Sequence, residues 1–139
     1  MSASQGTGDG PDSELVEFAH RILDMARNGE TERLTAYVDE GVPVNLTDPQ
    51  GNTLLMLAAY HGHEATVRAL LERGAEPDRL NDRGQSPLAG AVFQGAIGVV
   101  HALVEAGADP MAGTPSAIDS ARMFGRDEML ALLTGPNAP

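Results

Sequence analysis

The chain has 139 residues and no cysteine, which is enough for one domain with a real core and excludes disulfides and thiolate metal sites. Twenty acidic residues against nine arginines and no lysine give a net charge of −11, which argues against nucleic acid or an anionic membrane as a partner. No segment is long and apolar enough to span a membrane and no secretory signal pattern opens the chain, so we expect a cytoplasmic protein. Arginine without lysine, with many alanines and glycines, is typical of GC-rich bacterial genomes.

The first segment, residues 1–12, is rich in glycine and serine, and we expect a disordered tail. Its glycine-rich run follows no predicted strand and precedes no lysine, so it does not match a phosphate-binding loop. Residues 13–28 predict a helix, with Asp12 and Ser13 as candidate N-caps. Apolar residues recur at helical spacing on one side of this helix, at Leu15, Phe18, Ala19, Ile22, Leu23 and Ala26.

The middle of the chain repeats itself, with glycines at the same places in two successive stretches. The pairs, each 33 residues apart, are Gly62 with Gly95 and Gly74 with Gly107. Weaker copies surround Gly29 and Gly125. We therefore expect one domain of four copies, at about residues 13–47, 48–80, 81–113 and 114–134, followed by a tail over residues 135–139.

Each inner copy has the pattern of a helix, a tight turn, a second helix and a polar loop. Thr53 and Ser86 stand where an N-cap hydroxyl is needed, and Pro87 takes a first helical position that tolerates its missing N–H. Gly62 and Gly95 supply the left-handed backbone that ends the first helix. Over the whole chain the pattern predicts helices near residues 13–28, 31–40, 53–61, 64–73, 86–94, 97–106, 116–124 and 127–134.

Helices this short are marginal in isolation, and each pair carries apolar residues on more than one side. Such a pair becomes stable when neighbouring pairs stack and bury both flanks. The second helices share this feature, with Val67, Leu70 and Leu71 recurring as Val100, Leu103 and Val104. The sequence therefore predicts an all-α solenoid of four stacked helix-turn-helix repeats with finger loops.

Several stretches of the inner copies form an extended motif. They are DPQGNTLLMLAAYHGH at residues 48–63, LLERGAEPD at 70–78, NDRGQSPL at 81–88 and LVEAGADP at 103–110. These stretches resemble the ankyrin repeat family, and the resemblance covers residues 15–134. It implies a small bacterial ankyrin repeat protein.

Three features depart from the family's pattern. The family's Thr-Pro-Leu-His is TLLM at residues 53–56 and SPLA at 86–89, so its histidine is absent from both copies. Gly90 stands where the other inner copy has Leu57, which we expect to loosen that helix. The spacing from the third copy to the fourth is three residues short, so we expect a truncated last finger loop.

The pair His61 and His63 invites an interpretation as a metal or catalytic site. The pair lies across a helix-ending turn and has no third ligand nearby in sequence, whereas zinc sites need three or four ligands. In the family that the chain resembles, the second histidine of this pair is a structural turn residue. We therefore expect no metal, no cofactor and no catalysis.

Two residues precede the central glycine of each copy, and in a stacked array such equivalent positions form a ladder along one surface. The pairs are Arg27-Asn28, Tyr60-His61, Phe93-Gln94 and Met123-Phe124. Three of the five aromatic residues fall there, which favours a contact surface for a partner. The alternative is that Phe93 and Met123 fold partly into the core.

The resemblance implies a module that binds another protein through its first helices and finger loops. The predicted binding residues are Tyr60, His61, Phe93, Gln94, Met123 and Phe124 on the helices, and Pro49, Gln50, Asn52, Asp82, Arg83 and Gln85 on the fingers. Two alternatives stay open: a self-associating structural protein, and a metal-binding enzyme that uses His61 or His63.

The last copy is more apolar than a terminal repeat should be, because Met129 and Leu132 stand where earlier copies have smaller or more polar residues. We therefore expect a monomer that self-associates weakly through its C-terminal repeat. The alternative is that these residues face inward, or that the tail covers them.

Overall fold

The computed structural model describes residues 11–135, with side chains from Ser13 onward. This part of the chain forms eight helices: α1 (Pro11–Asn28), α2 (Thr31–Asp39), α3 (Leu54–Tyr60), α4 (Glu64–Glu72), α5 (Pro87–Gln94), α6 (Ile97–Glu105), α7 (Ala117–Met123) and α8 (Asp127–Thr134). Helices α2 to α8 begin and end within one residue of the predicted ranges. Helix α1 begins at Pro11, so Asp12 and Ser13 lie inside it and do not cap it. The predicted tails at residues 1–10 and 136–139 lie outside the described residues.

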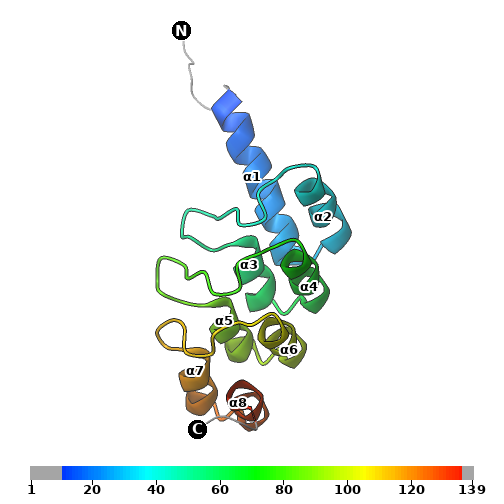
Figure 1. Ribbon diagram of the computed structural model, residues 1–139. Helices are drawn as coiled ribbons and strands as arrows, with labels where there is room; N and C mark the ends of the chain where they lie inside the picture. Colours follow the sequence, from blue (N-terminus) through cyan, green and yellow to red (C-terminus); the bar gives the residue numbers. More distant parts are fainter. Residues whose placement is uncertain (1–10, 136–139) are drawn as a thin grey trace.

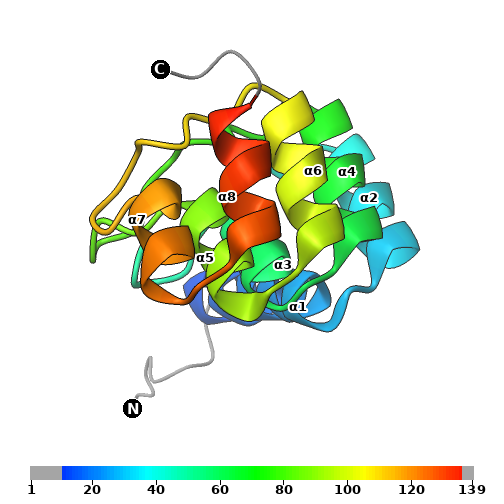
Figure 2. The same cartoon turned by 90° about the horizontal axis from the view of Figure 1, so that it is seen from below.

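The helices stack as four antiparallel pairs in two layers. Helices α1, α3, α5 and α7 form one layer and α2, α4, α6 and α8 form the other (Figures 1 and 2). The finger loops, residues 40–53, 73–86 and 106–116, project beyond the first layer. Within residues 11–135, bridged extended backbone is limited to one pair, Thr47 and Thr53. The predicted all-α solenoid of four repeats is confirmed.

Short-range hydrogen bonds set the ends of the first helices. Thr53, Ser86 and Ser116 each accept the backbone N–H three residues ahead, at 3.0, 3.0 and 3.1 Å. Gly62 and Gly95 follow the helix ends with φ of 78° and 75°, a conformation that other residues rarely adopt. The N-caps and the glycine turns are therefore as the sequence predicts.

The core is aliphatic and continues along the whole stack. Its largest fully buried side chains come from the first six helices: Ile22, Leu23, Leu34, Leu54, Leu55, Val67, Leu70, Leu88, Val92, Val99, Val100 and Leu103, with Met129 and Leu133 of α8 nearly as buried. Helix α3 packs against both α1 and α5, and buried Ala58 and Ala59 allow this close approach. Since every inner repeat shares its core with two neighbours, no repeat has a core of its own.

One polar contact recurs between repeats at the start of the second helices. The His63 ring bonds through Nε2 to the carbonyl oxygen of Arg27 at 2.7 Å. Two repeats along, Arg126 takes the equivalent place and donates to the carbonyl oxygen of Phe93 at 3.1 Å. Both side chains lie over the glycine turn of the preceding repeat. His63 is thus a structural residue, as the resemblance implies.

The finger loops are tied to one another by main-chain hydrogen bonds. The N–H of Asp82 donates to the carbonyl oxygen of Gln50 at 3.0 Å, and the N–H of Thr114 donates to that of Gly84 at 2.9 Å. The fingers therefore form one continuous edge beside the first-helix layer.

The two ends of the stack differ from the sequence-based expectation. Leu15 is 66% exposed although it follows the apolar spacing of α1, because the first turns of α1 extend beyond the next repeat (Figure 1). Met129 is only 5% exposed, and Leu132 packs partly buried against the core. The apolar residues of the last repeat thus face inward, and the hypothesis of self-association through them loses its basis.

Candidate functional site

Three aromatic rings form a continuous row across the first-helix layer. The rings of Tyr60 and Phe93 lie parallel, with centroids 5.9 Å apart and an interplanar angle of 7°. Phe124 meets Phe93 edge-on, with centroids 5.4 Å apart. We call Tyr60, Phe93 and Phe124 the aromatic row.

The aromatic row is exposed to solvent. Tyr60 is 41% exposed, and Phe93 and Phe124 are each 48% exposed. Met123, next to Phe124, is 67% exposed. Phe93 and Met123 therefore belong neither to the buried core nor to the partly buried residues packed against it, unlike the alternative in which they fold partly into the core. Aromatic groups in contact with water on a rigid scaffold have apolar area still available for burial.

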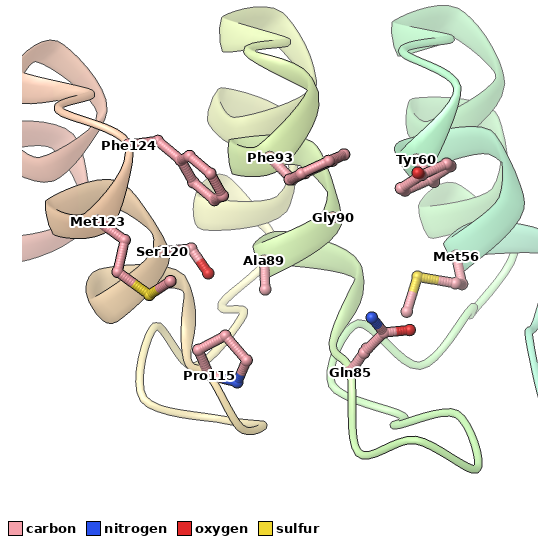
Figure 3. Close-up of a pocket in the computed structure, with 10 residues that line it drawn as sticks. All are labelled: Met56, Tyr60, Gln85, Ala89, Gly90, Phe93, Pro115, Ser120, Met123 and Phe124. Carbon is pink, nitrogen blue, oxygen red and sulfur yellow. The ribbon is translucent and has the colours of Figure 1, made fainter.

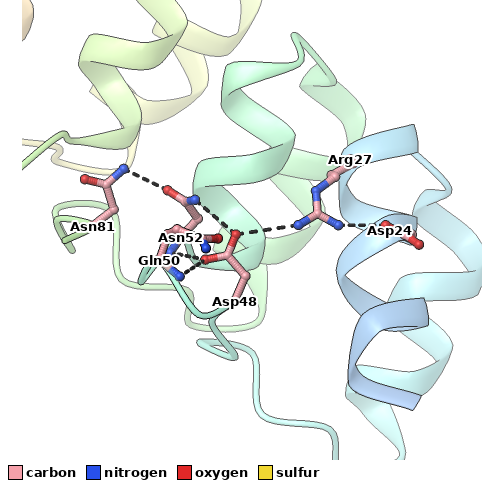
Figure 4. Close-up of polar contacts among 6 residues, drawn as sticks. All are labelled: Asp24, Arg27, Asp48, Gln50, Asn52 and Asn81. Atoms are coloured by element: carbon pink, nitrogen blue, oxygen red, sulfur yellow. Dashed lines mark hydrogen bonds and ion pairs between the residues drawn. The ribbon is translucent and has the colours of Figure 1, made fainter. Parts of the chain in front are cut away.

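The ladder begins with a charged residue in the first repeat. Arg27 pairs with Asp24 at 2.6 Å and reaches the carboxylate of Asp48 at 3.5 Å (Figure 4). Asp48 is buried and accepts N–H groups of Gln50 and Asn52, both at 2.9 Å, together with the Asn52 amide at 3.0 Å. This network joins the first finger loop to the end of α1.

The same contacts determine the charge state of Asp48. Burial raises the pKa of its carboxyl group, but hydrogen bonds from Asn52 and Gln50 and the charge of Arg27 outweigh this, so the pKa lies below its ordinary value. Partial desolvation of the His61 ring, together with its position near His63 and the charge of Arg27, lowers the pKa of His61. At neutral pH Asp48 is therefore ionised and His61 is uncharged.

A hollow of about 220 Å³ lies beside the aromatic row, between α3, α5 and α7 (Figure 3). None of its ten lining side chains is charged: Met56, Tyr60, Gln85, Ala89, Gly90, Phe93, Pro115, Ser120, Met123 and Phe124. We call it the first hollow. The hollow is deepest against α5, because Ala89 and Gly90 there take the places that the larger Met56 and Leu57 hold on α3.

A second hollow of about 320 Å³ adjoins the first on the finger side. The two share Met56, Tyr60 and Gln85, so they form one groove. The rest of the second lining is mostly polar: Gln50, Asn52, Leu57, Asn81 and Arg83. Asn81 repeats the role of Asp48, because its side-chain oxygen accepts the N–H groups of Arg83 and Gln85, both at 3.0 Å.

The structure brings most of the predicted binding residues to this groove. Eight of them line it: Tyr60, Phe93, Met123, Phe124, Gln50, Asn52, Arg83 and Gln85. The other four, Pro49, His61, Asp82 and Gln94, are exposed nearby but do not line either hollow.

The sequence-based prediction missed the floor of the groove. Met56, Leu57, Ala89 and Gly90 lie one turn before the ladder residues on the same helices. These residues could have been predicted from their spacing, because residues three or four positions before Tyr60 and Phe93 lie on the same helix face.

The histidine pair does not form a metal site of the usual kind. The rings of His61 and His63 are 6.4 Å apart, and His63 is engaged with the Arg27 carbonyl. Among the described residues, no three His, Cys, Asp or Glu side chains gather in a way that could hold a metal ion. No helix of residues 11–135 is both long enough and apolar enough to span a membrane.

Comparison with known proteins places this arrangement in a family. A family model described as ankyrin repeats, in three copies, matches residues 22–114. A Pseudomonas aeruginosa protein described as an ankyrin repeat protein is 49% identical over 57 residues, which are 41% of this chain and 33% of that protein. The crystal structure of the human ASB11 ankyrin repeat domain is similar with a TM-score of 0.75 and 30% identity, over 84% of this chain and 53% of that one. The chain belongs to the ankyrin repeat family.

Proposed function

We propose that this protein binds another protein in the groove formed by its first helices and finger loops, without catalysis of its own. The observation that carries the proposal is the exposed aromatic row on the rim of an uncharged hollow. Ankyrin repeats generally act as protein-interaction modules, which agrees with this proposal.

The energetics favour the aromatic row as the centre of the interface. Aromatic side chains bury a large area and lose little rotamer freedom, so they are over-represented among interface residues whose truncation costs about 2 kcal/mol or more. Rim charges such as Asp82 mainly affect the rate of association. We therefore expect affinity to concentrate on Tyr60 and Phe93 and to depend little on Pro49, His61 and Gln94.

The test is the double change Tyr60→Ala with Phe93→Ala. A partner is first captured by the wild-type protein from a cell lysate, and its affinity is then measured by calorimetry. We expect the double variant to bind at least about 30-fold more weakly, since 2 kcal/mol corresponds to that factor. Its stability should fall by only about 1–2 kcal/mol, because both rings are half exposed and lose mainly their mutual stacking.

The matched control is Leu15→Ala with Val16→Ala. This change also removes exposed apolar area, 66% and 53% exposed in the two residues, but far from the groove. The control should bind the partner as the wild type does. A partner that binds the Tyr60/Phe93 variant normally would place the interface elsewhere and refute the proposal.

A further inference from the structure

Gly90 is a glycine that the backbone of α5 does not require. It lies inside a helix at ordinary dihedral angles, where glycine is unfavourable relative to alanine. A Cβ atom at Gly90 would meet Tyr60 and Met56 at 3.6–3.8 Å, which is normal van der Waals contact. Neither a turn nor a close contact therefore requires glycine at this position. The absence of a side chain at Gly90 instead leaves space in the first hollow (Figure 3).

The volume of the first hollow limits what it can hold. At about 220 Å³ it is smaller than the usual pockets for small-molecule ligands, which begin near 300 Å³. A cavity of about 150 Å³ accommodates a benzene ring. The hollow therefore fits one bulky apolar side chain, aromatic or aliphatic, between the aromatic row and Met56.

The second hollow adds a positive charge and side-chain amides, of which Gln85 already accepts a hydrogen bond from Asn81 at 2.8 Å. Arg83 is the charged residue of its lining, and within the described part of the chain it forms no ion pair within 4.0 Å. The side-chain amides of Gln50 and Gln85 also face this hollow, where they can bond to the backbone of an extended segment. Neighbouring Asp82 does not line the hollow, and its carboxylate lies against Gly51.

The acidic residues of the protein do not cancel this charge. Helices α3 and α5 carry no charged residue, whereas the second-layer helices carry most of the acids that lie on described helices: Glu32, Asp39, Glu64, Glu72, Glu105, Asp127 and Glu128. Packed helices lie about 8–10 Å apart, which is about one Debye length in physiological salt. On the first layer, Asp24 and Asp48 are paired with Arg27. Over residues 11–135, Arg83 is therefore the one charge in the lining of the second hollow, with the neighbouring Asp82 carboxylate placed against Gly51.

We infer that the groove recognises an extended segment of a partner in which one bulky apolar side chain fills the first hollow and a carboxylate pairs with Arg83. The two hollows share Met56, Tyr60 and Gln85, so a short extended segment can reach both of them at about 3.3 Å per residue. This inference rests on the proposed function and specifies the chemistry of the partner.

The test is selection from a phage-displayed library of random peptides on the full chain. We expect the selected peptides to combine a bulky apolar residue with Asp or Glu at a fixed short spacing in the same peptide. Arg83→Glu should weaken the selected peptides by about tenfold or more, and replacing their acid by lysine should restore binding to this variant. Arg79→Glu, at another exposed arginine of the same loop that does not line the groove, is the matched control and should change little.

Gly90→Leu tests the first hollow, because leucine is the residue at the equivalent position on α3. This variant should lose the preference for peptides that contain a bulky apolar residue, while its melting temperature stays near that of the wild type. Gly90→Ala, whose added atom makes ordinary contacts, is the milder variant if leucine disturbs folding. It should raise the melting temperature and weaken apolar peptides.

Selection of basic peptides, or of peptides indifferent to Arg83→Glu and to both Gly90 variants, would overturn the inference. So would the absence of any enriched peptide. If in that case a captured partner still loses binding to the Tyr60/Phe93 variant, the proposed function stands and only the specified chemistry is wrong. If the partner binds that variant as tightly as the wild type, both the proposed function and the inferred partner chemistry are wrong.

Discussion

At the scale of single residues, Asp48 and Asn81 show two solutions to the same problem. Each stands at the start of a finger tip and accepts two backbone N–H groups with one side-chain oxygen. Asp48 adds a charge that also pairs with Arg27 and the Asn52 amide. Asn81 instead donates its amide to Asn52 at 2.7 Å, so the two finger tips are linked.

This equivalence predicts how changes at Asp48 affect stability. Asp48→Ala removes every acceptor from a buried site, and we expect a loss of about 2–3 kcal/mol in the free energy of unfolding. Asp48→Asn keeps the two bonds that Asn81 makes and should lose only about 1 kcal/mol. Urea denaturation of the three proteins measures both values. Equal losses would mean that the charge, and not the backbone bonds, carries the stabilisation.

The lowered pKa of Asp48 adds a pH dependence. Its unperturbed value is 3.8, and its folded pKa lies below that, so the ionised form stabilises the fold at any pH above about 4. This contribution is lost as the pH falls through the folded pKa. The stability gap between the wild type and Asp48→Asn should therefore be constant from about pH 7 to about pH 5 and close at lower pH.

At the scale of helices, the contact at the start of the second helix is present in two repeats and missing in the one between them. His63, Ala96 and Arg126 occupy the same position, and His63 and Ala96 have nearly identical backbone angles, −91° and 85° against −89° and 84°. Only Ala96 lacks a group that can reach the carbonyl of the preceding repeat. Its Cβ lies 3.8 Å from the place of a Cβ on Gly62, so the site above that turn is open.

We predict that Ala96→His stabilises the protein. The new ring should donate to the carbonyl oxygen of Tyr60 as His63 bonds to Arg27, with a gain of about 1 kcal/mol in the free energy of unfolding. Thermal and urea denaturation measure this gain. His63→Ala is the reciprocal control and should cost about 1–2 kcal/mol, because it leaves a carbonyl without its partner. An Ala96→His variant that melts below the wild type would contradict the prediction.

At the scale of the whole molecule, stability is shared along the stack. Second helices of successive repeats are bridged by exposed ion pairs such as Arg73 with Asp39 and Arg68 with Glu105, both at 2.9 Å. Exposed pairs of this kind contribute little in salt. The continuous aliphatic core is the main link between repeats.

The inward orientation of Met129 also bears on the oligomeric state. With the last repeat covering its own apolar residues, we expect a monomer of 14.5 kDa. Sedimentation velocity at increasing concentration should give one species at that mass. A mass that rises with concentration would contradict this, and loss of the rise in Leu15→Asp with Val16→Asp would locate the contact at the exposed start of α1.

The sequence by itself determined the features that depend on neighbours along the chain. The hydroxyl N-caps at Thr53 and Ser86 act over three residues, and the turns at Gly62 and Gly95 depend on one residue's backbone. The repeat of these local signals was enough to predict the helices, their pairing and the family. It also selected residues of which eight of twelve line the groove.

Only the tertiary structure decided which side chains stay exposed. Leu15 and Met129 both follow an apolar pattern, yet one is exposed and the other buried, because exposure depends on whether a neighbouring repeat covers the position. Phe124 joins the aromatic row although it stands one residue later than Phe93 in its repeat, and only the contact of the two rings, with centroids 5.4 Å apart, shows this. The hollow at Gly90 likewise exists only between three helices, so no single segment of the sequence encodes it.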